Sequence, residues 1–144
     1  MKIRRSITAA IAAVVLCGTG TLVLPAVASA HSAATTLKFT AVSYNTVSFG
    51  IGSTAYHEID FGSTGAKIGF DDVYAIAQTC CSVTADVAFA INGGLLYGSF
   101  ATNGGPTFSG TVTGGTEAFK GVTGTITGTT NGNLTKMRFT ITYS

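Results

Sequence analysis

Apolar and polar residues alternate along most of the chain after residue 36, as expected of β-strands that turn one face toward a core. Every second residue from Val83 to Ile91 is apolar, the turn sequence Asn92-Gly93-Gly94 follows, and residues 95–101 form a second, largely apolar run. An Asn-Gly pair between two such runs is typical of a tight β-hairpin. The pattern therefore predicts antiparallel strands at 83–91 and 95–101.

The last run of the chain shows the same period. Its apolar side chains from Met137 to Tyr143 occupy one face, and we expect it to pair with residues 122–127 across a turn at Asn131-Gly132-Asn133. Further strands are predicted at 37–44, 56–61, 70–76 and 107–113, with a weaker one at 47–51. About eight short strands at roughly ten-residue spacing favour an antiparallel sandwich or a closed barrel. No segment shows a sustained helical period, so the predicted class is all-β.

The first 30 residues have the order of a secretory signal peptide. Three basic residues precede an apolar stretch, and the segment ends in the small residues Ala28-Ser29-Ala30. The unbroken apolar run is shorter than the about 20 residues that a membrane-spanning helix needs. We therefore expect a signal peptide at 1–30, secretion, and one mature domain at 31–144 without a stable membrane anchor. The pair Arg4-Arg5 leaves both the general and the twin-arginine export routes open.

Charge changes the picture once residues 1–30 are set aside. The whole chain has a formal net charge of +2, but residues 31–144 hold five Lys and Arg against six Asp and Glu. Nucleic-acid binding needs clustered basic residues, so that class of protein is excluded. All nine Phe and five Tyr lie in the mature part, which argues against intrinsic disorder.

Two cysteines remain in the mature part, and they are adjacent: Cys80 and Cys81. Neighbouring Cα atoms lie about 3.8 Å apart, less than the roughly 4.4–6.8 Å of an ordinary disulfide. Two separate thiols, a strained bond between the neighbours and an intermolecular disulfide all stay open. The chain has only two histidines, too few for a zinc site beside these thiols, so no metal is expected.

A glycine-rich segment near the C-terminal end resembles a known family motif. Residues 114–124 read Gly-Gly-Thr-Glu-Ala-Phe-Lys-Gly-Val-Thr-Gly, similar to the Gly-Gly-Thr-Gly-x-Phe-x-Gly-Ala-x-Gly turn of plant dirigent proteins and the allene oxide cyclase barrel superfamily. Residues 65–69, Gly-Ala-Lys-Ile-Gly, resemble the Gly-x-Lys-x-Gly turn of small secreted bacterial members. Glu117 and Val122 depart from the motif, since the family usually has glycine and alanine there. The resemblance covers residues 55–144.

The resemblance implies an eight-stranded antiparallel β-barrel with an apolar cavity, trimeric in the plant proteins and free of metal and organic cofactors. Dirigent proteins guide the coupling of phenoxy radicals, and allene oxide cyclases close a ring derived from an epoxide. We interpret the motif as a tight connection between strands in which Phe119 packs as an apolar plug. A phosphate loop is excluded, because the segment lacks a Lys-Ser/Thr ending and a strand-to-helix context.

Acids and phenols on otherwise apolar faces are the candidate catalytic residues, because burial raises the pKa of a carboxyl group and makes it a proton donor. Asp72 shares its face of the predicted strand 70–76 with Tyr74, whereas Asp71 lies on the opposite face. Asp86 lies among small residues that leave room for a ligand. Asp72, Tyr74 and Asp86 are therefore the predicted catalytic residues.

Three polar residues of the predicted strand 56–61 have a simpler interpretation. Glu58 and Asp60 share a face with Tyr56, and acids near a strand end are usually solvated or bonded to a turn amide. His57 lies on the other face and is expected to be a hydrogen-bonded structural residue rather than a base.

Two functions are consistent with the sequence. The first is a secreted barrel that binds a small apolar or phenolic molecule and guides its cyclisation or stereoselective coupling, as a cofactor-independent cyclase, isomerase or dirigent protein. The second is a non-catalytic carrier, or a structural or interaction barrel filled by its own side chains, since eight strands permit either. Sparse charge and repeated apolar faces also favour a homo-oligomer, a trimer by analogy with the plant proteins.

Overall fold

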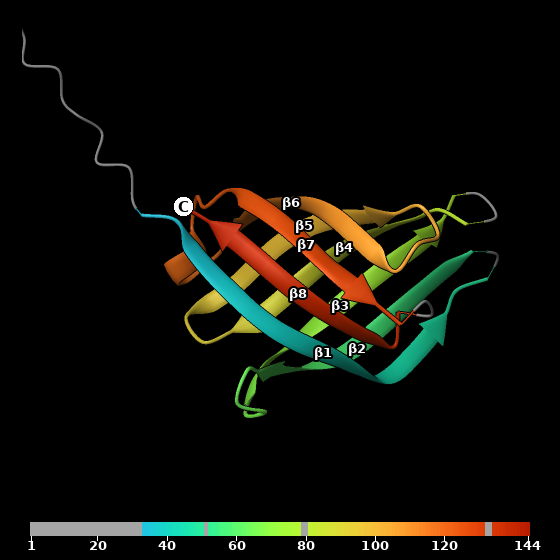
Figure 1. Cartoon of the computed structure of the whole chain (residues 1–144), viewed down its shortest axis with the longest axis horizontal. Coiled ribbons are helices and arrows are strands. Elements are labelled where there is room, and N and C mark those ends of the chain that lie inside the picture. The colour runs from blue at the N-terminus through green and yellow to red at the C-terminus, as the bar shows by residue number, and fades with distance from the viewer. Residues whose placement is uncertain (1–32, 51, 79–80, 132–133) are drawn as a thin grey trace, which may run out of the picture. The chain divides into compact units, whose positions relative to one another are not determined.

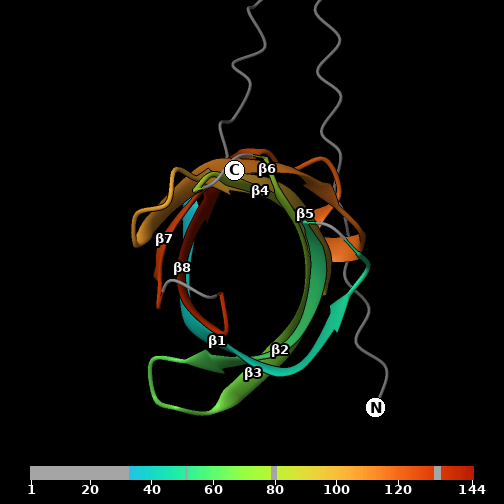
Figure 2. The same cartoon turned by 90° about the vertical axis from the view of Figure 1, so that its right-hand side faces the viewer.

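The chain folds into a closed antiparallel β-barrel (Figure 1; Figure 2), seen in a computed structural model that describes residues 33–50, 52–78, 81–131 and 134–144. Each strand pairs with its neighbours along the chain, and β8 pairs with β1 to close the sheet. The strands are β1 Thr35–Ser48, β2 Ser53–Gly62, β3 Lys67–Ala77, β4 Val83–Ile91, β5 Gly94–Thr102, β6 Thr107–Gly115, β7 Gly124–Thr130 and β8 Lys136–Tyr143. The predicted all-β, eight-stranded antiparallel barrel is confirmed. Residues 1–30, the predicted signal peptide, lie outside the described residues.

Two strands differ from the sequence prediction. β1 is one continuous strand where two were expected, because the register shifts between Ser43 and Asn45 in a β-bulge that bends the strand without ending it. β7 begins at Gly124 rather than at residue 122. The preceding residues form a single 3-10 turn, η1 (Glu117–Phe119), and the connection out of this turn passes through Gly121 at a φ of 79°.

The turn that resembles the family motif is built with backbone strain. Glu117 has a φ of 51°, in the left-handed region that glycine adopts freely and that costs other residues about 1–2 kcal/mol. This is the position where the resembling family has glycine. Phe119 is 4% exposed, and its ring packs edge-on against Tyr143 with a centroid distance of 5.6 Å. The predicted apolar plug is therefore confirmed, since Phe119 is buried and packs against Tyr143 near the end of β8.

Five phenylalanine rings fill the middle of the barrel. The ring of Phe139 is their centre, and the other four centroids lie 5.1–5.9 Å from it. The four are Phe39, Phe89, Phe100 and Phe108. A glycine on the strand next to Phe108 makes room for its ring, since a Cβ at Gly128 would lie 2.8 Å from Cε2 of Phe108. The core is thus an aromatic cluster whose packing requires a glycine, without a side chain, next to the ring of Phe108.

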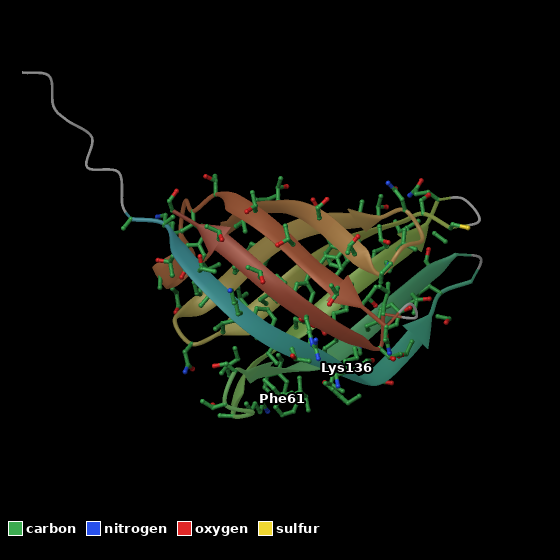
Figure 3. All side chains as sticks on the ribbon, viewed as in Figure 1. Phe61 and Lys136 are labelled. Atoms are coloured by element: carbon green, nitrogen blue, oxygen red, sulfur yellow. The ribbon has the colours of Figure 1, made fainter. Side chains whose placement is uncertain are left out.

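The outer surface of the barrel carries most of the remaining side chains, among them Phe61 and Lys136 (Figure 3). Aromatic residues on the outside of β1–β5 and of the connection after β1 have exposed fractions of 38–64%. These outer aromatic residues are Tyr44, Phe49, Phe70, Tyr74 and Tyr97. No helix among the described residues is long and apolar enough to cross a membrane. Cys81 is exposed, and Cys80 lies outside the described residues, so the alternatives for the two thiols stay open.

Candidate functional site

Three acidic side chains point into the barrel from two neighbouring strands. Glu58 and Asp60 alternate with less buried residues on β2, and Asp71 of β3 lies directly opposite Glu58 in the register. Their exposed fractions are 0% for Glu58, 0% for Asp60 and 2% for Asp71. The interpretation of Glu58 and Asp60 as solvated acids is therefore wrong, because closure of the sheet places their side of β2 inside. We call these three residues the acid cluster.

The surroundings of the acid cluster carry no compensating charge. Asp60 lies opposite Ala41 of β1, and Asp71 lies opposite Phe89 of β4. Apart from the acids, the buried polar residues of the described part of the chain are two threonines. No described basic side chain is buried, and the interior of the barrel therefore holds three acids and no base.

Outside the cluster itself, the described residues offer no hydrogen-bond donor to these carboxylate oxygens. Burying an ionised carboxylate without a partner costs about several kcal/mol of solvation free energy. The acid cluster is therefore more stable when its carboxyl groups hold protons. A metal ion is not indicated as the partner, because no group of three His, Cys, Asp or Glu in the described ranges has the geometry to hold one.

Burial raises the pKa of all three carboxyl groups. For Glu58 burial raises the pKa to about 7, opposed by a hydrogen bond with Asp71 and reinforced by the charge of Asp60. Burial raises the pKa of Asp60 to about 6, again opposed by a hydrogen bond with Asp71. Burial, and then the charges of Asp60 and Glu58, raise the pKa of Asp71 to about 11. Near neutral pH, Asp71 therefore keeps a proton and becomes the donor that the two other carboxylates lack.

A protonated carboxyl group beside ionisable ones is suited to acid–base chemistry. One group can donate a proton while its neighbour accepts one, and pairs of carboxyl groups whose pKa values are pushed apart are a common way to divide the two roles. Since the three groups share protons, their titration belongs to the acid cluster as a whole. Positioned proton transfer of this kind contributes about 10²–10⁴-fold to the rate of a reaction.

Tyr56 extends the acid cluster along the inner face of β2. It precedes Glu58 by two residues, on the side of the barrel end that carries the β1–β2 connection. Burial and the charge of Glu58 raise the pKa of Tyr56, while a hydrogen bond with Thr54 lowers it. The half-buried phenol therefore stays protonated and is a hydrogen-bond donor between the acid cluster and that end of the barrel.

The sequence-predicted catalytic residues lie together, but on the outer surface. Tyr74 pairs with Asp86 across β3 and β4, and both line a shallow depression of ≈ 400 Å³ with Asp72 and Tyr97. Asp72 is 69% exposed, and its Oδ1 lies 2.5 Å from Nδ1 of His57. The structural interpretation of His57 as a hydrogen-bonded residue is confirmed. A catalytic role of Asp72, Tyr74 and Asp86 stays a prediction, and it concerns this outer depression rather than the interior.

The sequence pattern alone does not reveal the acid cluster, because β3 carries its large side chains on the outside. Phe70, Tyr74 and Ile76 make the outer face of this strand look like a core face, whereas the inner face has Asp71 followed by two small apolar residues. One signal for the inner face is available. Val73 and Ala75 lie opposite Val87 and Ala85 of β4, so small apolar residues continue across both strands on this face.

No family model matches the chain, and no curated protein matches it. Among solved structures, "Pyocyanin demethylase" is similar with a TM-score of 0.66 and 14% sequence identity, over 76% of this chain and 100% of the other. "AbnU: An exo-specific intermolecular Diels-Alderase" is similar with a TM-score of 0.62 and 8% identity, over 76% of this chain and 96% of the other. These likenesses show the fold. The chain shares a small closed barrel with both proteins, and membership of the allene oxide cyclase or dirigent families is not confirmed.

Proposed function

We propose that the barrel interior binds a small, largely apolar or phenolic molecule and that the acid cluster transfers protons to and from it, in a cofactor-independent cyclisation, isomerisation or coupling. The observation that carries this proposal is three buried acids without a counter-ion. Such a group destabilises a fold, so its presence in an otherwise apolar core favours a chemical role over a structural one. A carrier that binds the same molecule without reaction is the alternative.

The comparisons support the proposal at the level of small-molecule chemistry. Two solved structures that share the fold are named as a demethylase of pyocyanin and as a Diels-Alderase. The glycine-rich turn at residues 114–124, which resembles that of dirigent proteins and allene oxide cyclases, adds a second link to proteins that steer reactive small molecules. A fold serves many functions, so both links are analogies and the acids carry the argument.

Two further parts of the proposal concern the setting of the barrel. We propose secretion through the segment 1–30, and a homo-oligomer that covers some of the outer aromatic residues, because exposed aromatic groups of this number are typical of contact surfaces. Native mass spectrometry of the exported protein should give the mass of residues 31–144, a multiple of that mass and any retained ligand. An uncleaved chain would contradict the proposed secretion through residues 1–30. A monomer at high concentration would contradict the proposed homo-oligomer.

The proton-transfer role can be tested with a probe substrate, 5-nitrobenzisoxazole. A carboxylate takes its ring C–H proton while the N–O bond breaks, and the phenolate product is followed by absorbance. We expect the wild type to accelerate this reaction as the pH rises through about 6 to 7, because Asp60 and Glu58 ionise there. The double variant Glu58→Gln/Asp60→Asn should lower kcat/KM by about 100-fold or more. Glu117→Gln, an exposed acid on η1, is the matched control and should leave the rate unchanged.

Two results would contradict the proposal. A rate that the double variant does not change would show that the acid cluster transfers no proton to this probe. A rate lost in Asp72→Asn or Asp86→Asn, with the double variant unaffected, would place the chemistry in the outer depression instead.

A further inference from the structure

We propose that the ligand of the acid cluster is an organic cation: a molecule with an apolar body and a protonated nitrogen that pairs with Glu58 and Asp60. This inference rests on the proposed function and adds the charge of the molecule to it. It is carried by the mismatch inside the barrel, where three buried acids have no hydrogen-bond donor from outside the cluster and no basic side chain beside them among the described residues.

The basic residues of the mature chain lie on the surface and do not neutralise the acid cluster. All five basic side chains of residues 31–144 are exposed. They are Lys38, Lys67, Lys120, Lys136 and Arg138. A positive charge that reaches the cluster must therefore come with the ligand, because none of these side chains is in the interior.

The residues around the acid cluster favour an organic cation over a bare metal ion. The acids do not have the geometry of a metal site in the described part of the chain. Next to them lie aromatic faces, with Phe89 directly opposite Asp71 in the register and Phe39 5.4 Å from Phe89 between ring centroids. Aromatic rings attract organic cations as well as apolar groups, by about 0.5–2 kcal/mol for each well-placed ring. The carboxyl groups would therefore pair with the protonated nitrogen of such a ligand, and the aromatic rings would pack against its apolar body.

Entry to the acid cluster requires side chains to move, since its oxygens are closed off from solvent. Phe119 and Tyr143 pack together near the end of the barrel at which β8 finishes. Half-buried Tyr56 lies between the acids and the other end, and its hydroxyl can donate a hydrogen bond to an incoming ligand. We therefore place the entry path on the side of Tyr56.

The charge of the ligand determines how its binding depends on pH. A cation pairs with ionised carboxylates, so it must displace the protons that the acid cluster holds, and its binding tightens by up to about tenfold per pH unit for each proton released. The groups that face the cluster are Tyr56 on β2 and the acids themselves, while Ala41 of β1 and Phe89 of β4 are apolar. His57 and Asp72 lie on the outside and are not part of this exchange. A neutral ligand would show no such dependence.

Three probes of the same shape test the inference: 1-naphthylmethylamine, which is a cation between pH 6 and 8, the neutral 1-naphthylmethanol, and anionic 1-naphthoate. Isothermal titration calorimetry should give a Kd for the amine at least about tenfold below that of the alcohol at pH 8, and about tenfold tighter binding of the amine at pH 8 than at pH 6. Measurements in phosphate and in Tris should show release of about one proton. The naphthoate should bind weakest.

Variants separate the possible outcomes. Glu58→Gln/Asp60→Asn should remove the preference for the amine while keeping the alcohol, and Glu117→Gln should change neither. If the alcohol binds the wild type as tightly as the amine does, or if the amine keeps its affinity in the double variant, the cation inference is wrong but a ligand-binding barrel survives. If none of the three probes binds and the reaction of 5-nitrobenzisoxazole is not accelerated, the proposed function itself fails.

Discussion

An Asp71→Asn variant is expected to be more stable than the wild type at pH 8, by up to about 6 kcal/mol in the free energy of unfolding, and to differ little from it near pH 4. Asp71 is 2% exposed and is surrounded by two other acids. Asparagine has nearly the same shape but no proton to lose. Its amide N–H groups can donate to Glu58 and Asp60 at any pH.

The sign of this effect follows from the raised pKa of Asp71. In the unfolded chain an aspartate has a pKa near 3.8, whereas in the folded barrel the pKa of Asp71 is about 11. Between these pH values the unfolded chain has released a proton that the folded protein still holds. The free energy of unfolding therefore falls as the pH rises, by about 1.4 kcal/mol per pH unit. Glu58 and Asp60 act in the same direction up to about pH 7 and 6.

Urea denaturation between pH 4 and 9 measures this directly, with Asp86→Asn as the control. Asp86 is an exposed acid on the outer side of β4, so its substitution should change the free energy of unfolding by less than about 0.5 kcal/mol at any pH. If Asp71→Asn instead weakens the fold at pH 8, or leaves the slope with pH unchanged, then Asp71 does not hold its proton in the folded state.

Phe139→Ala is expected to be the most damaging single substitution in the aromatic cluster, with a loss of about 3–5 kcal/mol in the free energy of unfolding. Phe139 is 2% exposed and lies 5.1–5.9 Å, between ring centroids, from four other phenylalanines. Truncation removes the one ring that all four contact and leaves a cavity that a closed sheet cannot collapse to fill. A domain of this size has about 5–15 kcal/mol in total, so the loss is a large part of its stability.

The matched control for this loss is Phe49→Ala. Phe49 is 61% exposed, and its ring meets Tyr74 on the outer surface at a centroid distance of 6.1 Å. Denaturation should show a loss of less than about 1 kcal/mol for this variant. Equal losses for the two variants would mean that the aromatic cluster is not the core of the fold. Should Phe139→Ala fail to fold, Phe139→Leu offers a milder change, with an expected loss of about 1–1.5 kcal/mol.

The two substitutions separate what the interior contributes to stability from what it contributes to chemistry. The phenylalanines stabilise the barrel by burial of apolar surface. The acid cluster destabilises the barrel, because its carboxyl groups must either keep their protons above their usual pKa or stay ionised without a counter-ion. If replacing a buried acid by its neutral counterpart makes the protein more stable in denaturation but less active towards 5-nitrobenzisoxazole, then that acid serves the activity rather than the fold.

The alternation of residues in β4, β5 and β8 was enough to predict these strands and their hairpin, because alternation and an Asn-Gly turn act over short distances in the chain. The plug at Phe119 also followed from the local motif. The merged β1 was not predictable in this way. Its continuity depends on a bulge at Ser43–Asn45, and pairing with β2 and β8, rather than the local sequence, keeps this strand in register.

The sequence by itself determined the all-β class, the place of most strands and the two alternating sets of residues on each of these strands. Only the tertiary structure decided which set lies inside. On β3 one set has Asp72 and Tyr74 and the other has Asp71 and Val73; each combines an acid with apolar residues, and the larger apolar side chains belong to the set that lies outside. The choice is made when β8 pairs with β1, because closure of the barrel fixes one common inner face for all eight strands. That long-range event buries Asp71 with Glu58 and Asp60, and a pattern within one strand carries no information about it.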